Sequence, residues 1–312
     1  MAIRKFVVYD LNVERYARTL VPDAPAYGIV ADEAHKTIST VLDICRWLME
    51  QGADRDALVL VVGGGCTSDI AGFAASIYKR GVRYALYPTT LLSMVDASIG
   101  GKTGVNLDGY KNMIGLIRSP FRVEIHTEYL LSLPPREFRS GAAEMLKSFI
   151  IDNKGGFYEK AVKVLSGPFK PDELLPLIFA AGDVKRRIVG KDPYEDNLRR
   201  VLNLGHTCAH AIEWWQAQAP GRTDYSHGEA VAIGVIFAAR LSERMGACGA
   251  GLADKLAADF AACGLPTVPP CAAEELAPAF AKDKKADGDV INFVLINKIG
   301  KVSVCGVPAS DL

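Results

Sequence analysis

The sequence predicts an α/β domain with a Rossmann-like parallel sheet over residues 1–130 and a mainly α-helical domain over residues 131–312. Two observations support this fold class. The first third of the chain alternates short apolar runs with helical periodicity, which is typical of parallel strands joined by crossover helices. After Pro134 and Pro135, long helical patterns dominate. A chain of 312 residues also exceeds the size at which one hydrophobic core keeps growing, which favours two domains.

The apolar patterns predict the elements in chain order. In the first domain we expect strands over residues 6–9, 58–62 and 84–87, with helices over residues 37–51 and 69–78. In the second domain, helical periodicity predicts four long helices, over residues 136–151, 174–189, 201–215 and 229–245. Two apolar runs joined by residues 298–300 predict a hairpin of strands 290–295 and 301–305.

The overall composition disfavours several classes of partner. Lysine plus arginine equals aspartate plus glutamate, at 36 each, so the whole chain has no electrostatic attraction to nucleic acid or to an anionic membrane. No apolar run approaches the roughly 20 residues of a membrane span. The seven cysteines include no Cys-x-x-Cys pair, which is typical of reduced thiols. We therefore expect a cytoplasmic protein that binds neither nucleic acid nor membrane.

Three of the five histidines, His206, His210 and His227, lie close together in the sequence. Neutral imidazole is the commonest protein ligand for a catalytic metal. On a helix, Arg199, Asn203, His206 and His210 would project from one face, because they recur at steps of four and three residues. Packing alone does not account for such a polar stripe on an otherwise apolar helix. The pattern therefore predicts an enzyme.

Glu144 and Lys147 lie one helical turn apart inside an apolar stretch. A glutamate there is either a paired structural ion or a metal ligand. Glu144, His206 and His227 together would form a two-histidine, one-carboxylate site with an open position for substrate, as in catalytic zinc sites. His210 is then either a fourth ligand or a proton-transfer group.

A glycine-rich element, residues 63–65, lies where a strand is expected to pass into a helix. Such a turn lets a phosphate approach backbone amides, but it is equally consistent with a tight turn capped by Ser68 or Asp69. It is not the Gly-x-Gly-x-x-Gly fingerprint. Residues 100–103 imitate a Walker A loop without its first glycine, which is Asp96 here, and this argues against a nucleoside triphosphatase.

Several cations lie in or beside apolar or glycine-rich segments. Each lysine alone would usually be a surface residue with a buried stem. Together they suggest a cationic site for a doubly anionic substrate, because lysine and arginine bind phosphate and carboxylate well. These cations are Arg80, Lys102, Lys111, Lys147, Lys185 and Arg199.

Nine short motifs occur in a fixed order over most of the chain, at residues 63–69, 78–81, 88–92, 95–103, 111–113, 133–137, 143–147, 202–207 and 227–234. In this order they resemble the 3-dehydroquinate synthase family of sugar-phosphate cyclases. The resemblance implies a homodimer that converts the anionic sugar phosphate 3-deoxy-D-arabino-heptulosonate 7-phosphate to 3-dehydroquinate and phosphate, in the shikimate pathway. It also implies NAD and a metal, zinc or cobalt, on Glu144, His206 and His227.

The remaining site residues are carried over by the same resemblance. The implied NAD-binding positions are Asp10, Asn12, Asp32, Glu33, Lys36, Gly64, Gly65, Asp69, Thr89, Thr90, Lys102, Lys111 and Ser132. The implied substrate-binding positions are Arg80, Asp96, Lys102, Lys111, Asn112, Lys147, Lys185, Arg199 and one of Lys284 and Lys285. The implied catalytic positions are Lys102, Lys147, Lys185, Arg199, Asn203 and His210.

Two alternatives remain open at this stage. The first is another sugar-phosphate cyclase, acting on sedoheptulose 7-phosphate or glucose 6-phosphate. Relatives of that kind commonly alter Lys111, Asn112, Arg199 or His210, all of which are present here. The second is a degenerate scaffold, which should have lost metal ligands or lysines. One departure from the family pattern, Asp32 in place of a frequent glycine, would affect the adenine side of NAD.

Overall fold

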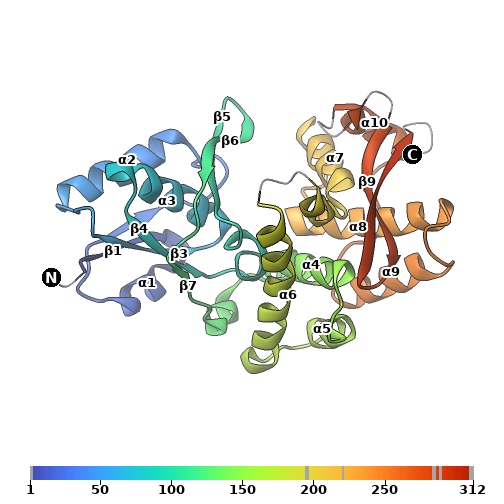
Figure 1. The fold of residues 1–312 in the computed structure, drawn as a ribbon, viewed down its shortest axis with the longest axis horizontal. Helices are drawn as coiled ribbons and strands as arrows, with labels where there is room; N and C mark the ends of the chain where they lie inside the picture. The colour runs from blue at the N-terminus through green and yellow to red at the C-terminus, as the bar shows by residue number, and fades with distance from the viewer. Residues whose placement is uncertain (1–2, 194–196, 220, 283–285, 288–289, 309–312) are drawn as a thin grey trace. The chain divides into compact units, whose positions relative to one another are not determined.

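The computed structural model describes residues 3–193, 197–219, 221–282, 286–287 and 290–308. The chain divides into two compact units, residues 1–133 and 134–312 (Figure 1). Among the described residues, none of the helices combines the length and apolar character needed to cross a membrane.

The first unit is built on a parallel sheet of five strands in the order β2-β1-β3-β4-β7. Their bounds are β1 Lys5–Asp10, β2 Ala26–Ile29, β3 Leu58–Gly63, β4 Arg83–Pro88 and β7 Arg122–Val123. From β1 the chain first adds β2 on one side, then crosses to place β3 on the other. In sheets of this kind, ligands bind outside the carboxyl ends of the strands where the order reverses, which here is between β1 and β3.

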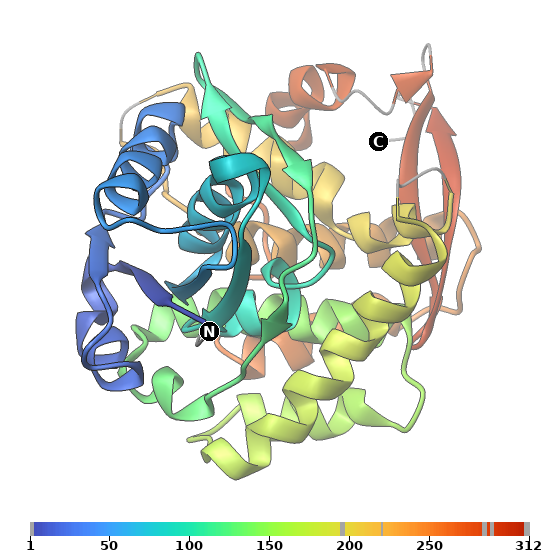
Figure 2. The same ribbon diagram turned by 60° about the vertical axis from the view of Figure 1, so that its left-hand side comes forward.

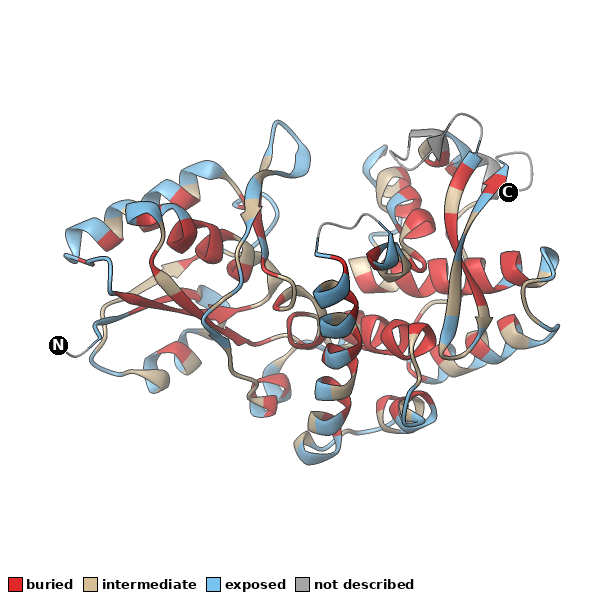
Figure 3. Ribbon diagram, in the orientation of Figure 1, coloured by how far each residue is buried: buried red, intermediate tan, exposed pale blue. Residues whose placement is uncertain are grey.

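Helices cover both faces of this sheet. Helix α1, Glu14–Leu20, packs on the face that carries Val7, Leu60 and Val62, among others. Helices α2, Ile38–Glu50, and α3, Gly65–Ile77, pack on the opposite face. Because successive strand residues point to alternate faces and both faces are covered, β3 is buried along its whole length (Figure 3).

An antiparallel hairpin, β5 Lys102–Leu107 and β6 Tyr110–Ile117, forms a separate two-stranded sheet (Figure 2). The sequence patterns predict no strands there. β5 mixes polar, apolar and glycine residues, and β6 carries several apolar side chains but is mostly exposed, so neither strand shows a clear apolar alternation. Four short helical turns complete the unit: η1 Leu11–Val13, η2 Tyr78–Arg80, η3 Ser93–Ala97 and η4 Thr127–Ser132.

The second unit is mainly helical. Its helices are α4 Pro135–Ile151, α5 Phe157–Leu165, α6 Pro171–Lys191, η5 Leu198–Asn203, α7 His206–Ala217, α8 His227–Arg244, α9 Leu252–Ala262 and α10 Ala273–Lys282. A small sheet follows, β8 Ala286–Asp287, β9 Val290–Lys298 and β10 Lys301–Pro308, and it includes the predicted C-terminal hairpin. Helices α4 and α8 are buried over most of their length, as their red colour in Figure 3 shows.

One predicted element is wrong. A single helix over residues 201–215, with Arg199, Asn203, His206 and His210 on one face, does not form. The chain instead makes the short turn η5, ends it at Asn203, and starts α7 at His206. Gly205 breaks the helix, because its φ of 78° lies in the left-handed region that favours glycine. His206 and His210 stay together on α7, while Arg199 and Asn203 belong to η5.

Candidate active site

In the first unit, many of the predicted NAD-binding residues follow the carboxyl ends of the parallel strands. Asp10 ends β1, Gly64 follows β3, and Thr89 follows β4. The Asp10 side chain accepts hydrogen bonds from the backbone and side-chain nitrogens of Asn12, at 2.9 and 3.0 Å. These positions lie at the edge of the sheet where its topology predicts a nucleotide.

The glycine turn after β3 packs closely against neighbouring side chains. Helix α3 begins at Gly65, and Gly64 precedes it in an extended conformation without a side-chain cap. The alternative reading, in which Ser68 or Asp69 caps the helix, is wrong, since both residues lie inside it. The Ser68 hydroxyl donates to the Gly64 carbonyl at 3.0 Å. A Cβ on Gly64 would lie 3.1 Å from Thr90. The first amides of α3 are therefore left to a ligand such as phosphate.

Lys36, itself a predicted site residue, joins two others of the first unit. Its side chain is buried, and Nζ donates to Asp69 Oδ2 and to Asn112 Oδ1, both at 2.6 Å. Asp69 lies on α3 and Asn112 on the β5–β6 hairpin. The hairpin is therefore fastened to the glycine turn by a buried charge and two hydrogen bonds.

Asn106 is a site residue that the sequence analysis missed. Its side chain donates to Glu33 Oε2 at 2.8 Å and accepts the backbone N–H of Asn112 at 2.9 Å. Its own N–H donates to the Lys36 carbonyl at 2.9 Å. Asn112 has a φ of 56°, a conformation that is rare outside glycine, and Asn106 holds it there. A single asparagine in a polar strand gives no sequence signal for this role.

The other predicted residues of the first unit differ in their surroundings. Arg80, Lys102 and Lys111 are exposed, Asp96 lies on η3, and Asp32 accepts a hydrogen bond from the backbone N–H of His35 at 2.8 Å.

The hydroxyl of Ser132 lies 2.7 Å from that of Tyr16 on α1, a partner that the sequence did not reveal. This contact ties the short turn η4 to the helix that covers one face of the sheet.

In the second unit, Glu144, His206 and His227 come together from three helices. Glu144 lies in the buried middle of α4, His206 is the first residue of α7, and His227 is the first residue of α8. One potential ligand atom from each lies within 4.8 Å of the others. Glu144 Oε1 is 3.6 Å from Nε2 of His206 and 3.7 Å from Nε2 of His227. These distances leave room for a cation bound to all three.

The chemistry of this cluster fits a metal. Nδ1 of His206 donates to the Leu204 carbonyl at 3.1 Å, and Nδ1 of His227 lies 3.0 Å from Glu213 Oε1. A neutral ring that donates from Nδ1 keeps a lone pair on Nε2, and such partners are typical of metal-binding histidines. Glu144 Oε1 is buried and accepts no hydrogen bond. A bound cation would satisfy an oxygen that is otherwise costly to bury.

The two histidine rings differ in their electrostatic surroundings. Burial lowers the pKa of His206 well below its usual value, and the charge of Lys147 lowers it further. Burial also acts to lower the pKa of His227, but the hydrogen bond to Glu213 and the charge of Glu144 outweigh it, so this pKa is raised. His206 is therefore neutral at physiological pH, which is the form that binds a metal.

Two predicted cations of the second unit are buried. Lys147 lies beside Glu144, and Arg199 lies on η5, the turn that precedes α7. Lys147 Nζ lies 2.5 Å from Glu144 Oε2 and donates to the Leu202 carbonyl at 2.9 Å. Arg199 donates from Nη1 to the Pro193 carbonyl at 2.6 Å. Both cations therefore have fixed positions in the interior.

The remaining predicted residues of the second unit vary in exposure. His210 is exposed on α7, and its ring centre lies 5.7 Å from that of His206. Lys185 is half-buried on α6, and Asn203 ends η5. Lys284 and Lys285 lie outside the described residues.

Comparison with known proteins agrees with this architecture. Family models described as 3-dehydroquinate synthase N-terminal and C-terminal match residues 26–140 and 141–286. A 3-dehydroquinate synthase of Acidithiobacillus ferrooxidans is 42% identical over 312 residues, covering 96% of this chain and 84% of that protein.

Two solved structures are also similar to the chain. A 2-deoxy-scyllo-inosose synthase complexed with carbaglucose-6-phosphate, NAD+ and Co2+ has a TM-score of 0.86 at 26% identity, covering 99% of this chain and 88% of that one. A 2-epi-5-epi-valiolone synthase from Streptomyces hygroscopicus subsp. jinggangensis, with NAD+ and Zn2+ bound, has a TM-score of 0.84 at 27% identity, covering 100% and 89%.

This chain combines a Rossmann-like sheet with a helical unit that brings together a carboxylate and two histidines. It shares its fold with the two solved enzymes, which places it in the class of enzymes that have this fold. Within that class, the chain belongs to the 3-dehydroquinate synthase family. The predicted family and fold class are confirmed.

Proposed function

We propose that this chain is a 3-dehydroquinate synthase, a lyase of the shikimate pathway that converts 3-deoxy-D-arabino-heptulosonate 7-phosphate to 3-dehydroquinate and phosphate. The reaction proceeds by transient oxidation, phosphate elimination, reduction and intramolecular aldol closure. The observation that carries this proposal is the cluster of Glu144, His206 and His227 in a chain whose relatives at about 40% identity bear that name. The protein would act in the cytoplasm as a homodimer.

NAD is assigned to the first unit. When bound, NAD+ would supply a reversible hydride acceptor for one ring alcohol of the substrate, with no net oxidation. The residues after β1, β3 and β4 would hold it, with the open first turn of α3 at its pyrophosphate. Lys36 would keep the β5–β6 hairpin against this turn.

The metal is assigned to the second unit, on Glu144, His206 and His227. A zinc or cobalt ion held there would supply a Lewis acid that acidifies the substrate alcohol. Leu204 and Glu213 orient the two rings so that both Nε2 atoms face Glu144 Oε1.

The resemblance to the family suggests roles for the other site residues. Lys102, Lys147 and Arg80 would bind phosphate, while Lys185 and Arg199 would face the carboxylate of the substrate. His210 is exposed at the second turn of α7 and would transfer protons. The substrate and the lysines that bind it would be oriented by Asp96, Lys111, Asn112 and Asn203.

A second candidate is a cyclase for another sugar phosphate. The similarity to a 2-deoxy-scyllo-inosose synthase, at 26% identity, favours it in fold. Arg199 argues against it, since a buried arginine suits a substrate carboxylate that glucose 6-phosphate and sedoheptulose 7-phosphate both lack.

The test is phosphate release from the heptulosonate phosphate with NAD+ and Zn2+, with 3-dehydroquinate followed by mass spectrometry. We expect equal amounts of both products, and loss of both in His206→Ala. The same assay with glucose 6-phosphate and sedoheptulose 7-phosphate provides the comparison. Turnover of either sugar without turnover of the heptulosonate would contradict the proposal.

A further inference from the structure

The first turn of α8 meets one face of α4 in three successive contacts. Arg136, Ser140 and Glu144 are spaced by four residues and so lie along one face of α4. Opposite them lie three consecutive residues at the start of α8, in reverse order: Glu229, Gly228 and His227. The candidate metal ligands Glu144 and His227 form the last of these three contacts.

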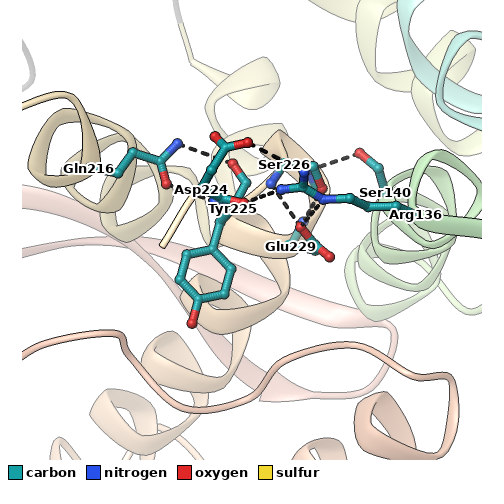
Figure 4. Close-up of polar contacts among 8 residues, drawn as sticks. Arg136, Ser140, Gln216, Asp224, Tyr225, Ser226 and Glu229 are labelled. Atoms are coloured by element: carbon teal, nitrogen blue, oxygen red, sulfur yellow. Dashed lines mark hydrogen bonds and ion pairs between the residues drawn. The ribbon is translucent and has the colours of Figure 1, made fainter. Parts of the chain in front are cut away.

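The contact furthest from the candidate metal site is an ion pair. Arg136 Nε donates to Glu229 Oε2 at 3.1 Å, and the Glu229 side chain is only 13% exposed (Figure 4). The guanidinium also donates to the Asp224 carbonyl and lies 3.3 Å from Asp224 Oδ2. Arg136 therefore holds both the first turn of α8 and the segment that leads into it.

Glu229 also takes part in the cap of α8. Its Oε2 accepts the Ser226 backbone N–H at 2.8 Å, and the Ser226 hydroxyl accepts the Glu229 N–H in return. Glu229 therefore contacts both the cap of α8 and the Arg136 guanidinium.

The middle contact, between Gly228 and Ser140, brings the two helix backbones into direct contact. Gly228 donates its N–H to the Ser140 hydroxyl at 3.1 Å, and a Cβ on Gly228 would lie 2.1 Å from the Ser140 carbonyl oxygen. The two backbones touch here, one residue from His227 and one turn from Glu144. A shift at the Arg136 end would therefore be passed to the His227 end.

The segment before His227 is also held by α7, the helix that carries His206. Gln216 donates to the Tyr225 carbonyl at 3.1 Å and accepts the Tyr225 N–H at 3.0 Å (Figure 4). Residues 224–226 are thus bound on two sides by the helices that supply the other two candidate ligands.

We propose that Arg136 and Glu229 are positioning residues that hold His227 at the metal-binding distance from Glu144. This inference rests on the metal site of the proposed function. A purely structural ion pair would affect stability alone. A positioning pair must also affect how tightly a metal binds and in what geometry.

The test measures Co2+ binding to the metal-free protein by visible absorption, together with its thermal unfolding. Arg136→Gln should raise the Co2+ dissociation constant about tenfold and alter the visible spectrum, as loss of outer partners does at other metal sites. Arg136→Lys should restore part of the affinity, because lysine keeps the charge but not the fork of donors.

Arg187→Gln is the matched control. Arg187 on α6 pairs with Asp152 at the end of α4 at 2.9 Å, with similar exposed fractions of 46% and 22%. Arg187→Gln should bind Co2+ within about twofold of the wild-type affinity, while its thermal stability falls by about as much as that of Arg136→Gln. The proposal is overturned if Arg136→Gln binds Co2+ like the wild type, or if Arg187→Gln weakens binding equally.

If Arg136→Gln does not fold, Glu229→Gln replaces it, because glutamine can still accept the Ser226 N–H. Wild-type affinity in that variant would contradict the proposal. A wild-type protein that binds no Co2+ would overturn the metal site and this inference together. One that binds Co2+ but releases no phosphate from the heptulosonate would overturn the proposed function alone.

Discussion

Lys147 places a positive charge in the protein interior beside a candidate metal ligand. Its Nζ lies 2.5 Å from Glu144 Oε2, and both side chains are at most 3% exposed. Without a metal, the positive charge of Lys147 balances the buried negative charge of Glu144. A bound cation would have to share Glu144 with it, so Lys147 stabilises the metal-free protein and competes with the metal.

Lys147→Met should therefore lower the free energy of unfolding of the metal-free protein by about 3–5 kcal/mol, since it leaves a buried charge without a partner. The change is measured by chemical unfolding in the presence of a chelator. Glu144→Leu combined with Lys147→Met should recover most of the loss, because two apolar side chains replace the pair. Equal instability of the single and double variants would show that volume, not charge, causes the loss.

At this scale the sequence predicted the residue types better than their partners. Chemistry suggested Glu144, His206 and His227 as a metal site, but the sequence left Glu144 open between a ligand and a structural ion pair. Glu213, which orients His227, could not be recognised, because it lies on α7 and reaches His227 only through the crossing of α7 and α8. Asn106 was missed for the same reason, since its partners lie on two other segments, residues 33–36 and β6.

Helices α7 and α8 cross where Gly205 meets Gly234. A Cβ on Gly234 would lie 2.0 Å from the Gly205 carbonyl oxygen, so the two backbones are in direct contact. Gly205 immediately precedes His206, and the crossing therefore sets where α7 begins.

Gly234→Ala should destabilise the protein by about 1–3 kcal/mol through overpacking and should also weaken Co2+ binding by displacing His206. Gly190→Ala on α6 is the control, since its Cβ would meet nothing within 4 Å. That change should be neutral or stabilising by up to about 1 kcal/mol. Thermal unfolding and Co2+ titration of both variants decide the matter; equal effects would contradict a role for the crossing.

The elements that the sequence predicted correctly are those with a strong apolar period. Strand β3 and helices α4, α6 and α8 begin and end within a few residues of the predicted bounds. The predictions were wrong or missing where tertiary packing determines the backbone conformation. The break at Gly205 is set by α8, and the β5–β6 hairpin depends on the buried Lys36, neither of which a local pattern reports.

The two units should respond to different ligands. The first amides of α7 and α8 have no partner within their own helix, and a cation on His206 and His227 would hold both helix starts. NAD+ would instead act on the turns after β1, β3 and β4.

Hydrogen exchange measured by mass spectrometry should therefore show the strongest protection by Zn2+ at residues 204–210 and 224–231, and by NAD+ at the strand ends. At a free concentration of 100 times the dissociation constant, each ligand should slow exchange there by up to about 100-fold. His206→Ala should lose the Zn2+ effect and keep the NAD+ effect. Protection of the same peptides by both ligands would argue against this division.

The division into a parallel sheet and a helical unit was accessible from the sequence, because alternating strand and helix patterns imply crossovers of one hand. The strand order was not, since the position of β2 beside β1 is a matter of packing that apolar runs do not encode.

The alignment of α4 with the start of α8 depends on the number of residues between Arg136 and Glu144. Arg136, Ser140 and Glu144 share a face only because each is four residues from the next. Inserting one residue between Arg136 and Glu144 would turn the carboxylate by about 100° away from the histidines, with every side chain of the site unchanged. The stretch from 136 to 144 is therefore intolerant of insertions and deletions.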